Sequence, residues 1–244
     1  MIILSAGMQK SGSAWYFNLI NDMLIAAGNP DVRTVREQFG LHPVLQFHNC
    51  NIGNLSPENL RSLLAPHYAG CTFVVKTHSG PTPEVASLMA RNILKATYIY
   101  RDPRDVIVSA MDHGRKIRKE GDNHTFAAYD TLEKAVVAVK EWLDIAGQWM
   151  SLETVFCVRY EDLLAQPAMV LQRVAEFLEI DMTHDSLTAL LAAYHKEQLS
   201  GSSIDFLHFN KGVSQRFRSV MSGEQQSYCL RHLAESIHRM GYRV

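Results

Sequence analysis

The sequence predicts an α/β fold in which a central parallel β-sheet is flanked by helices on both faces. Four short apolar runs lack the polar alternation of a half-exposed strand: Ile2–Leu4, Cys71–Lys76, Ala96–Tyr100 and Thr154–Arg159. Such runs are typical of strands that are buried on both faces. Helical segments separate the runs, which favours parallel strands joined by helical crossovers.

Helices are predicted where apolar residues recur at helical spacing or where a capping residue precedes proline. Asp102 as N-cap with Pro103 in the first turn starts one helix, which we expect to end near His113. Ser56 before Pro57 starts another. The expected helices are Trp15–Ala27, Pro57–Leu64, Glu84–Arg91, 103–113, Phe126–Trp149, Pro167–Leu178, Ser186–Tyr194 and Glu224–Met240.

Three stretches are expected to be irregular: Asn29–Asn54, the charge-rich Gly114–Asp122, and the Ser- and Gly-containing Leu199–Gly223. A solvated face is the default interpretation of the charge run. The sequence shows no internal repeat, low-complexity tract or linker, so 1–244 is predicted to be a single domain.

Composition limits the possible functions. With 244 residues, 47% of them apolar, the chain can fill a core, and a net charge of −1 gives no overall nucleic-acid signature. No basic leader or apolar run of about 18 residues indicates secretion or a membrane span. The cysteines form no CxxC pair, so neither zinc nor disulfides are expected and a cytoplasmic location is predicted. They are Cys50, Cys71, Cys157 and Cys229.

The segment after the first predicted strand has the features of an anion site. Gly7 and Gly12 stand in G-x-x-x-x-G spacing before a helix start, where free backbone N–H groups and the helix dipole attract a phosphate. A P-loop kinase would follow with lysine and a hydroxyl residue, whereas here Lys10 lies inside the loop and Ala14 offers no hydroxyl for magnesium. A plain solvated turn is the alternative for the loop taken alone.

Polar residues follow each predicted strand. They are Lys10, His78, Arg101 and Tyr160. Because the carboxyl ends of parallel strands meet at one edge of the sheet, these residues are expected to share one site. Lys76 is two residues before His78 and therefore projects to the same side of its strand.

These residues resemble the sulfotransferases that use 3′-phosphoadenosine 5′-phosphosulfate (PAPS). Residues 9–15 (QKSGSAW) resemble the family's first loop, approximately PKSGTTW, and residues 101–109 (RDPRDVIVS) match its R-x-P-x-D-x-x-x-S motif at every fixed position. Lys76-Thr77-His78 and the YEDL segment at 160–163 match two further motifs in the same order. The resemblance implies the P-loop NTPase-like three-layer sandwich.

The resemblance implies two anion sites for PAPS and for its product, 3′-phosphoadenosine 5′-phosphate (PAP). The residues carried over to the 5′-phosphosulfate end are Lys10, Ser11, Gly12, Ser13 and Ala14, the last where many members have threonine. Arg101 and Ser109 would bind the 3′-phosphate, while Trp15 and Tyr160 would contact adenine. On the residues alone, Arg101 could instead pair with Asp102 or Asp105, Trp15 could be a core residue, and Tyr160 could cap the sheet.

The same resemblance, together with the suitability of imidazole near neutral pH, makes His78 the predicted general base. Lys10 and Lys76 would neutralise charge developing during direct, in-line transfer, with no metal. His42, His48 or Asp112 would be the next candidates for the base. The alternatives for the whole chain are a magnesium-dependent small-molecule kinase and a non-catalytic protein that binds the same nucleotide.

The late motif, approximately R-K-G-x-x-G-x-W in the family, keeps only Lys211 and Gly212. Asn210 stands at the position of the arginine, Gln215 at the second glycine and Phe217 at the tryptophan, and Asn210, Lys211 and Gly212 would lie at the 3′-phosphate. Arg216 or Arg218 would supply the missing cation, unless this is a solvated basic loop. A family dimerisation segment is echoed only in part by 219–224, which leaves the oligomeric state open.

The acceptor is predicted to be a hydroxyl of a small molecule, a lipid or a sugar. Aromatic and apolar residues after the first helix and elsewhere would form an apolar pocket. They are Phe39, Phe47, Met111, Tyr129 and Phe206, while His42 and His48 would suit a sugar. Packing of these side chains on the sheet is the alternative.

Overall fold

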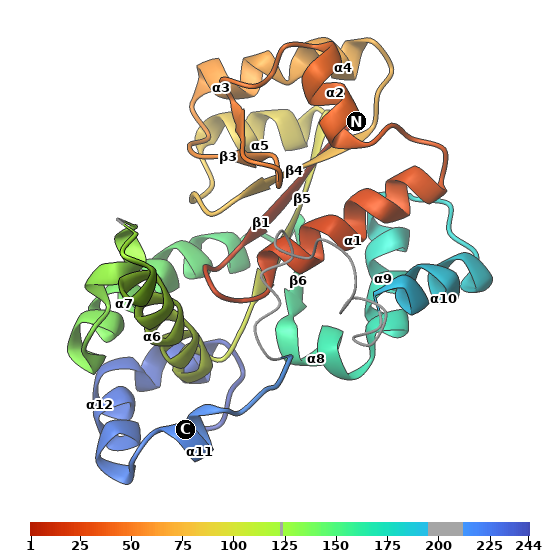
Figure 1. The fold of residues 1–244 in the computed structure, drawn as a ribbon. Helices are drawn as coiled ribbons and strands as arrows, with labels where there is room; N and C mark the ends of the chain where they lie inside the picture. The colour runs from red at the N-terminus through yellow and green to blue at the C-terminus, as the bar shows by residue number, and fades with distance from the viewer. Residues whose placement is uncertain (123, 195–211) are drawn as a thin grey trace.

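A computed structural model describes residues 1–122, 124–194 and 212–244. The predicted α/β fold is confirmed: six strands form one sheet in the order β2-β3-β4-β1-β5-β6, and helices cover both faces (Figure 1). The strands are β1 Ile2–Gly7, β2 Leu45–Gln46, β3 Asn51–Ile52, β4 Phe73–Thr77, β5 Leu94–Tyr100 and β6 Val155–Arg159. All neighbouring strands are parallel except β2 and β3, which are antiparallel at one edge.

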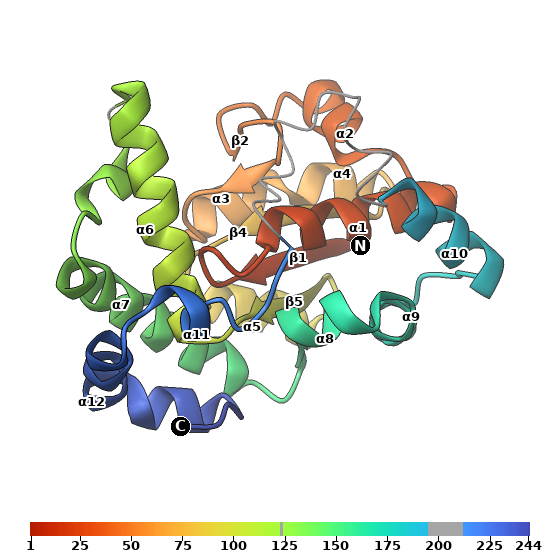
Figure 2. The ribbon, with the colours of Figure 1, turned by 60° about the horizontal axis from the view of Figure 1, so that its bottom comes forward.

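The central strands are buried because both of their faces are covered. Every residue of β1 and β4 is buried, which explains why their sequences lack polar alternation. On one face lies α1 (Ser13–Ala26), with α9 (Pro167–Leu178) and α10 (His184–Ala193) beside it. On the other lie α5 (Pro83–Ala90) and α7 (Leu132–Met150), backed by α12 (Gly223–Arg239) (Figure 2).

The stretch expected to be irregular at 29–54 holds more structure than the sequence suggested. Asp31 accepts the Arg33 N–H as the N-cap of α2, Val32–Gln38, and the short strands β2 and β3 follow. After them, the predicted helix over 57–64 divides into α3 (Pro57–Ser62) and α4 (Leu64–Tyr68). α2, β2 and β3 were missed because their apolar runs are too short to show a helical or strand period.

The helix after β5 was predicted too short. α6 spans Pro103–Glu120, and the charge-rich residues 114–120 form its last two turns, mostly solvated. Gly114 allows the helix to approach the following segment, because a Cβ there would lie 2.3 Å from the Phe126 carbonyl oxygen. The expected helix start at Phe126 was also wrong: η1 (Thr125–Ala128) comes first, and Thr131 then caps α7.

The strand register brings the predicted site residues to one edge. Gly7 at the end of β1 pairs with Ile99 near the end of β5, and Ala6 pairs with Thr77 at the end of β4. Tyr100 pairs with Arg159 at the end of β6. The residues that follow these strands therefore occur in the spatial order His78, the first loop, Arg101 and Tyr160.

Candidate active site

The shape of the first loop, between β1 and α1, is set by two left-handed residues and by hydrogen bonds of Ser11. Lys10 and Gly12 adopt left-handed conformations, with φ of 63° and 81°. The buried Ser11 hydroxyl donates to the carbonyl oxygens of Met8 (2.6 Å) and Ile99 (3.2 Å), so it shapes the loop. The N-cap of α1 is Gly12, which has no side chain to cap the helix. The first N–H groups of this 14-residue helix, including those of Ser13 and Ala14, thus face the loop with no capping side chain among the described residues.

Two features favour glycine at position 12: the left-handed backbone conformation and the closely packed ring of Tyr160. A Cβ at this position would lie 2.8 Å from the ring of Tyr160, the first residue of α8 (Tyr160–Ala165). The Tyr160 ring also makes an edge contact with Trp15 (centroids 6.3 Å apart) and lies 4.4 Å from the Arg101 guanidinium. The structure therefore brings the two predicted adenine contacts together with the predicted 3′-phosphate contact.

Lys10 is a cation in a largely apolar setting. Its Nζ lies 5.1 Å from the centroid of the Phe126 ring, and within the described part of the chain it makes no ion pair. Burial, with repulsion from Arg101, lowers the pKa of Lys10 to about 8, against an opposite effect of Asp112. A cation that lacks a carboxylate partner is suited to receive an anionic ligand.

His78 and Lys76 contact each other at the end of β4. The His78 Nδ1 lies 2.6 Å from the Gly7 carbonyl oxygen, which can only accept, so Nδ1 carries the proton. His78 Nε2 is then the unprotonated ring nitrogen and lies 2.7 Å from Lys76 Nζ, close enough to accept a hydrogen bond. Burial, with repulsion from Lys76, lowers the pKa of His78 to about 3, and burial lowers the pKa of Lys76 to about 7. Asn51 on β3 holds Lys76 from the other side, at 3.4 Å.

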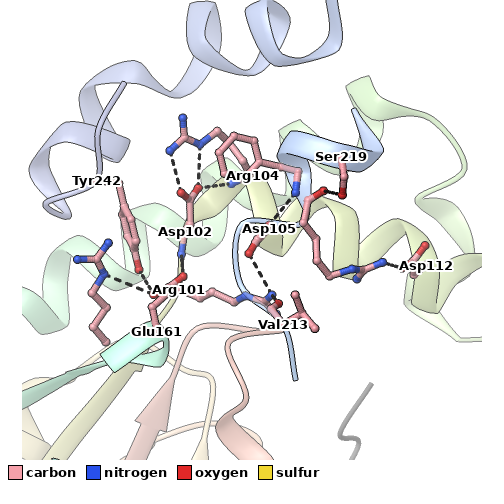
Figure 3. A network of polar contacts seen from close by, with 12 residues as sticks. Arg101, Asp102, Arg104, Asp105, Asp112, Glu161, Val213, Ser219 and Tyr242 are labelled. Carbon is pink, nitrogen blue, oxygen red and sulfur yellow. Dashed lines mark hydrogen bonds and ion pairs between the residues drawn. The ribbon is translucent and has the colours of Figure 1, made fainter. Parts of the chain in front are cut away.

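Arg101 is partly committed within the protein. Its Nη2 pairs with Asp105 on α6 at 3.1 Å and donates to the Val213 carbonyl oxygen at 2.9 Å (Figure 3). The alternative of an ion pair with Asp105 is therefore present, while Asp102 pairs with Arg104 instead. The buried Arg101 Nε has no partner among the described residues, which leaves a donor for an anion. Ser109 lies one turn beyond Asp105 on the same helix and is 5% exposed.

Two carboxylates of α6, those of Asp105 and Asp112, bind the segment that contains Arg216 and Phe217. The Phe217 N–H, at the start of α11 (Phe217–Val220), donates to Asp105 Oδ1 at 2.9 Å, and the Arg104 guanidinium lies 4.1 Å from the Phe217 ring. Arg216 pairs with Asp112 at 2.7 Å.

These contacts bear on several residues named from the sequence. Asp112 also pairs with Arg115 and is therefore engaged by two guanidinium groups. Gly212 is described, with φ of 58°, and Arg218 lies 5.4 Å from the Phe217 ring. Asn210, Lys211 and Phe206 lie outside the described residues.

The acceptor candidates from the sequence occupy different places. His42 pairs with Glu37 on α2 at 2.9 Å, and Phe47 is 75% exposed. The carbonyl oxygens of Phe47 and His48 accept from arginines of α2, which holds this loop on that helix. Phe39 and Met111 are half-buried against the core, as is Tyr129.

An aromatic cluster, of which the sequence reasoning named only Tyr129, lies closer to the predicted chemistry. Phe126, Tyr129 and Trp142 contact one another, with ring centroids 5.3–5.9 Å apart. Phe126 faces Lys10, while Trp142 and His78 line one small crevice. The sequence signal for this cluster was the spacing of aromatic residues at the start of the long amphipathic helix.

Asn51, which contacts Lys76, was also missed, because no pattern in the sequence pointed to it.

The whole chain matches a known family. The model of the sulfotransferase domain matches residues 2–241. The chain belongs to the sulfotransferase domain family. This membership confirms the resemblance seen in the motifs and counts against the kinase alternative.

The relatives of this sulfotransferase domain are distant. Luciferin sulfotransferase of Photinus pyralis is 24% identical and covers 93% of the chain, and flavonol 4′-sulfotransferase of Flaveria chlorifolia is 25% identical and covers 79%. The matches take in 66% and 65% of those proteins, so the chain spans just under two thirds of the curated relatives' length.

Solved structures agree on the fold of the sulfotransferase domain. A mouse sulfotransferase complexed with PAP superposes with a TM-score of 0.66 at 17% identity, over 97% of this chain and 84% of that one. Retinol dehydratase in complex with androsterone and PAP gives 0.61 at 17% identity, over 100% and 82%.

Within residues 1–122, 124–194 and 212–244, no group of three His, Cys, Asp or Glu side chains is arranged to hold a metal ion. No helix within the same residues has the length and apolar character needed to cross a membrane.

Proposed function

We propose that this sulfotransferase domain transfers a sulfuryl group from PAPS to a hydroxyl of a small-molecule acceptor, with His78 as general base. The observation that carries the proposal is the pair of contacts made by His78. Its Nδ1–H is fixed on the Gly7 carbonyl oxygen and its Nε2 faces Lys76, beside the loop that carries Lys10. This is a base held next to two cations, as transfer to an alcohol requires.

The residues present fit the donor at both ends. The start of α1, which no described side chain caps, and Lys10, which forms no ion pair with a described residue, suit the 5′-phosphosulfate. Arg101, whose buried Nε has no partner in the described part of the chain, and Ser109 suit the 3′-phosphate. Tyr160 packs on Gly12 between the two ends, where a nucleoside would lie. When bound, PAPS supplies an activated sulfuryl group on a phosphate leaving group.

The protein side chains have separate roles in the proposed transfer. Because the pKa of His78 is lowered to about 3, its Nε2 is unprotonated at neutral pH and can accept the proton of the acceptor hydroxyl. Lys76 must then release Nε2, and it can do so by moving its ammonium toward the leaving oxygen. Lys10 neutralises charge at the same oxygen. Transfer is direct and needs no covalent enzyme intermediate.

An aromatic or apolar alcohol is the acceptor class favoured over a sugar. The cluster of Phe126, Tyr129 and Trp142 lies beside Lys10 and His78, whereas His42 is engaged by Glu37. Aromatic walls suit planar apolar ligands. Two distant relatives are named for luciferin and for a flavonol.

Thermal shifts with PAP, ATP and ATP plus magnesium would test the donor. Ligand at 100 times its Kd stabilises a protein by about 2.7 kcal/mol, so we expect a rise in Tm with PAP and a smaller one with ATP. Transfer from labelled PAPS to phenolic, lipid and sugar acceptors then tests the chemistry. A shift with magnesium-ATP alone would overturn the proposal. PAP binding without transfer to any acceptor would favour the non-catalytic alternative.

A further inference from the structure

The Glu161 carboxylate joins two segments that carry proposed donor-binding residues. Its Oε1 accepts the backbone N–H of Asp102 at 3.1 Å. Asp102 directly follows Arg101, and Glu161 directly follows Tyr160. This one hydrogen bond therefore ties together the backbone positions from which the Arg101 and Tyr160 side chains extend. Their contact, with the guanidinium 4.4 Å from the ring centroid, depends on that spacing.

Tyr242, from the distant C-terminal part of the chain, orients Glu161. Its hydroxyl donates to Glu161 Oε2 at 2.7 Å, and its side chain is almost fully buried (Figure 3). Burial and the neighbouring Glu161 raise the pKa of Tyr242, so the hydroxyl keeps its proton and serves as a donor. The Arg159 guanidinium lies 4.1 Å from the Tyr242 ring and 3.5 Å from Glu161.

Arg243, the residue after Tyr242, contacts the segment in which β5 ends and α6 begins. Arg104 donates to Asp102 through Nε and Nη2, at 3.0 and 2.8 Å, and its Nη2 also donates to the Arg243 carbonyl oxygen at 2.9 Å. The C-terminal segment thus contacts Arg104 directly and reaches the Asp102 backbone through Glu161. Arg101 stands at the start of the turn between β5 and α6.

We propose that Glu161 and Tyr242 are positioning residues for recognition of the 3′-phosphate of the donor, acting through the backbone of Asp102. The inference rests on the proposed function. A guanidinium that binds a phosphate through two parallel hydrogen bonds tolerates only small errors in orientation. The path from Tyr242 through Glu161 to Asp102 sets the backbone orientation of Arg101, without touching the nucleotide.

Tyr242→Phe is the most selective test, because it removes the hydroxyl and keeps the ring under Arg159. We expect the Kd for PAP to rise about three- to tenfold, the size of one ordinary hydrogen bond, because the lost contact acts on Arg101 only indirectly. Adenosine 5′-phosphate lacks the 3′-phosphate, so its Kd should stay within about twofold. Glu161→Gln, measured in the same way, should lower the preference for PAP further.

Tyr228→Phe on α12 is the matched control, since its ring lies against His232 of the same helix. It should leave both Kd values unchanged. Unchanged PAP binding in Tyr242→Phe, or equal losses for both nucleotides, would overturn the inference while leaving the proposed function intact. A wild-type chain that does not prefer PAP over adenosine 5′-phosphate would overturn the proposed donor, and the inference with it.

Discussion

His78 donates its Nδ1–H to the backbone carbonyl oxygen of Gly7, 2.6 Å away. This bond fixes the tautomer of the imidazole, because a carbonyl oxygen cannot donate. It also joins the end of β4 to the end of β1, where the first loop begins. The position of the proposed base is thus set by the same backbone that forms the proposed sulfuryl-binding loop.

Substitution of His78 by alanine should abolish most turnover and spare donor binding. We expect kcat to fall by about 10²–10⁴, the usual contribution of a general base. The Kd for PAP should change little, because no proposed PAP contact is lost. Initial rates with labelled PAPS and titration with PAP check both parts. His232→Ala, an exposed histidine on α12, is the control. Wild-type turnover in His78→Ala would assign the proton transfer to another group.

Donor binding should weaken as pH rises through about 8, because the pKa of Lys10 is lowered to that value by burial and by Arg101. Lys10 is charged below this pH and neutral above it, so its attraction for an anion is lost on the alkaline side. We expect the affinity for PAP to fall by up to about tenfold per pH unit in that range.

Lys10→Met identifies the group responsible for this dependence. The variant should bind PAP more weakly at pH 7 and show a shallower alkaline fall, as measured by calorimetric titration. An unchanged slope in Lys10→Met would assign the titration to another group, with Lys76 the nearest candidate because burial lowers its pKa to about 7.

Arg101→Ala should remove the preference for a 3′-phosphate. The Kd for PAP should rise by about 10- to 100-fold, the size expected for a charge-assisted bidentate contact, with much less effect on adenosine 5′-phosphate. Removal of Arg101 also leaves the buried Asp105 without its cation, so Tm must be measured as well. Equal losses for both nucleotides would mean that Arg101 has only a structural role.

Two helical glycines should respond in opposite ways to alanine. In Gly114→Ala the new Cβ would lie 2.3 Å from a backbone oxygen of η1, so we expect a loss of about 1–3 kcal/mol in the free energy of unfolding. In Gly147→Ala the nearest atom is 3.5 Å away, in the flexible Arg239 side chain, and a gain of about 0.5–1 kcal/mol is expected.

Denaturant melts of both variants measure these changes. A neutral Gly114→Ala would show that α6 and η1 can move apart without cost.

Much of the sheet could be predicted because its strands are buried on both faces. Burial on both faces favours apolar residues along β1, such as Ile2, Ile3 and Leu4, and that preference is visible in the sequence without knowledge of any partner. The end of α6 could not be predicted in this way. In the sequence, Gly114 indicates the end of a helix. The structure shows that it lies within α6, where the close approach of η1 leaves no room for a Cβ.

The sequence by itself determined the residues whose positions follow from local order. These are the glycine loop before α1, Lys76 near the end of β4 and His78 just after it. Parallel strands carry such residues to one edge whatever the details of packing. Only the tertiary structure decided the partners that come from elsewhere in the chain, such as Asn51 at Lys76, Phe126 at Lys10 and Tyr242 at Glu161. The physical reason is that these contacts depend on the packing of whole elements, and side-chain packing between distant segments leaves no periodic trace in a single sequence.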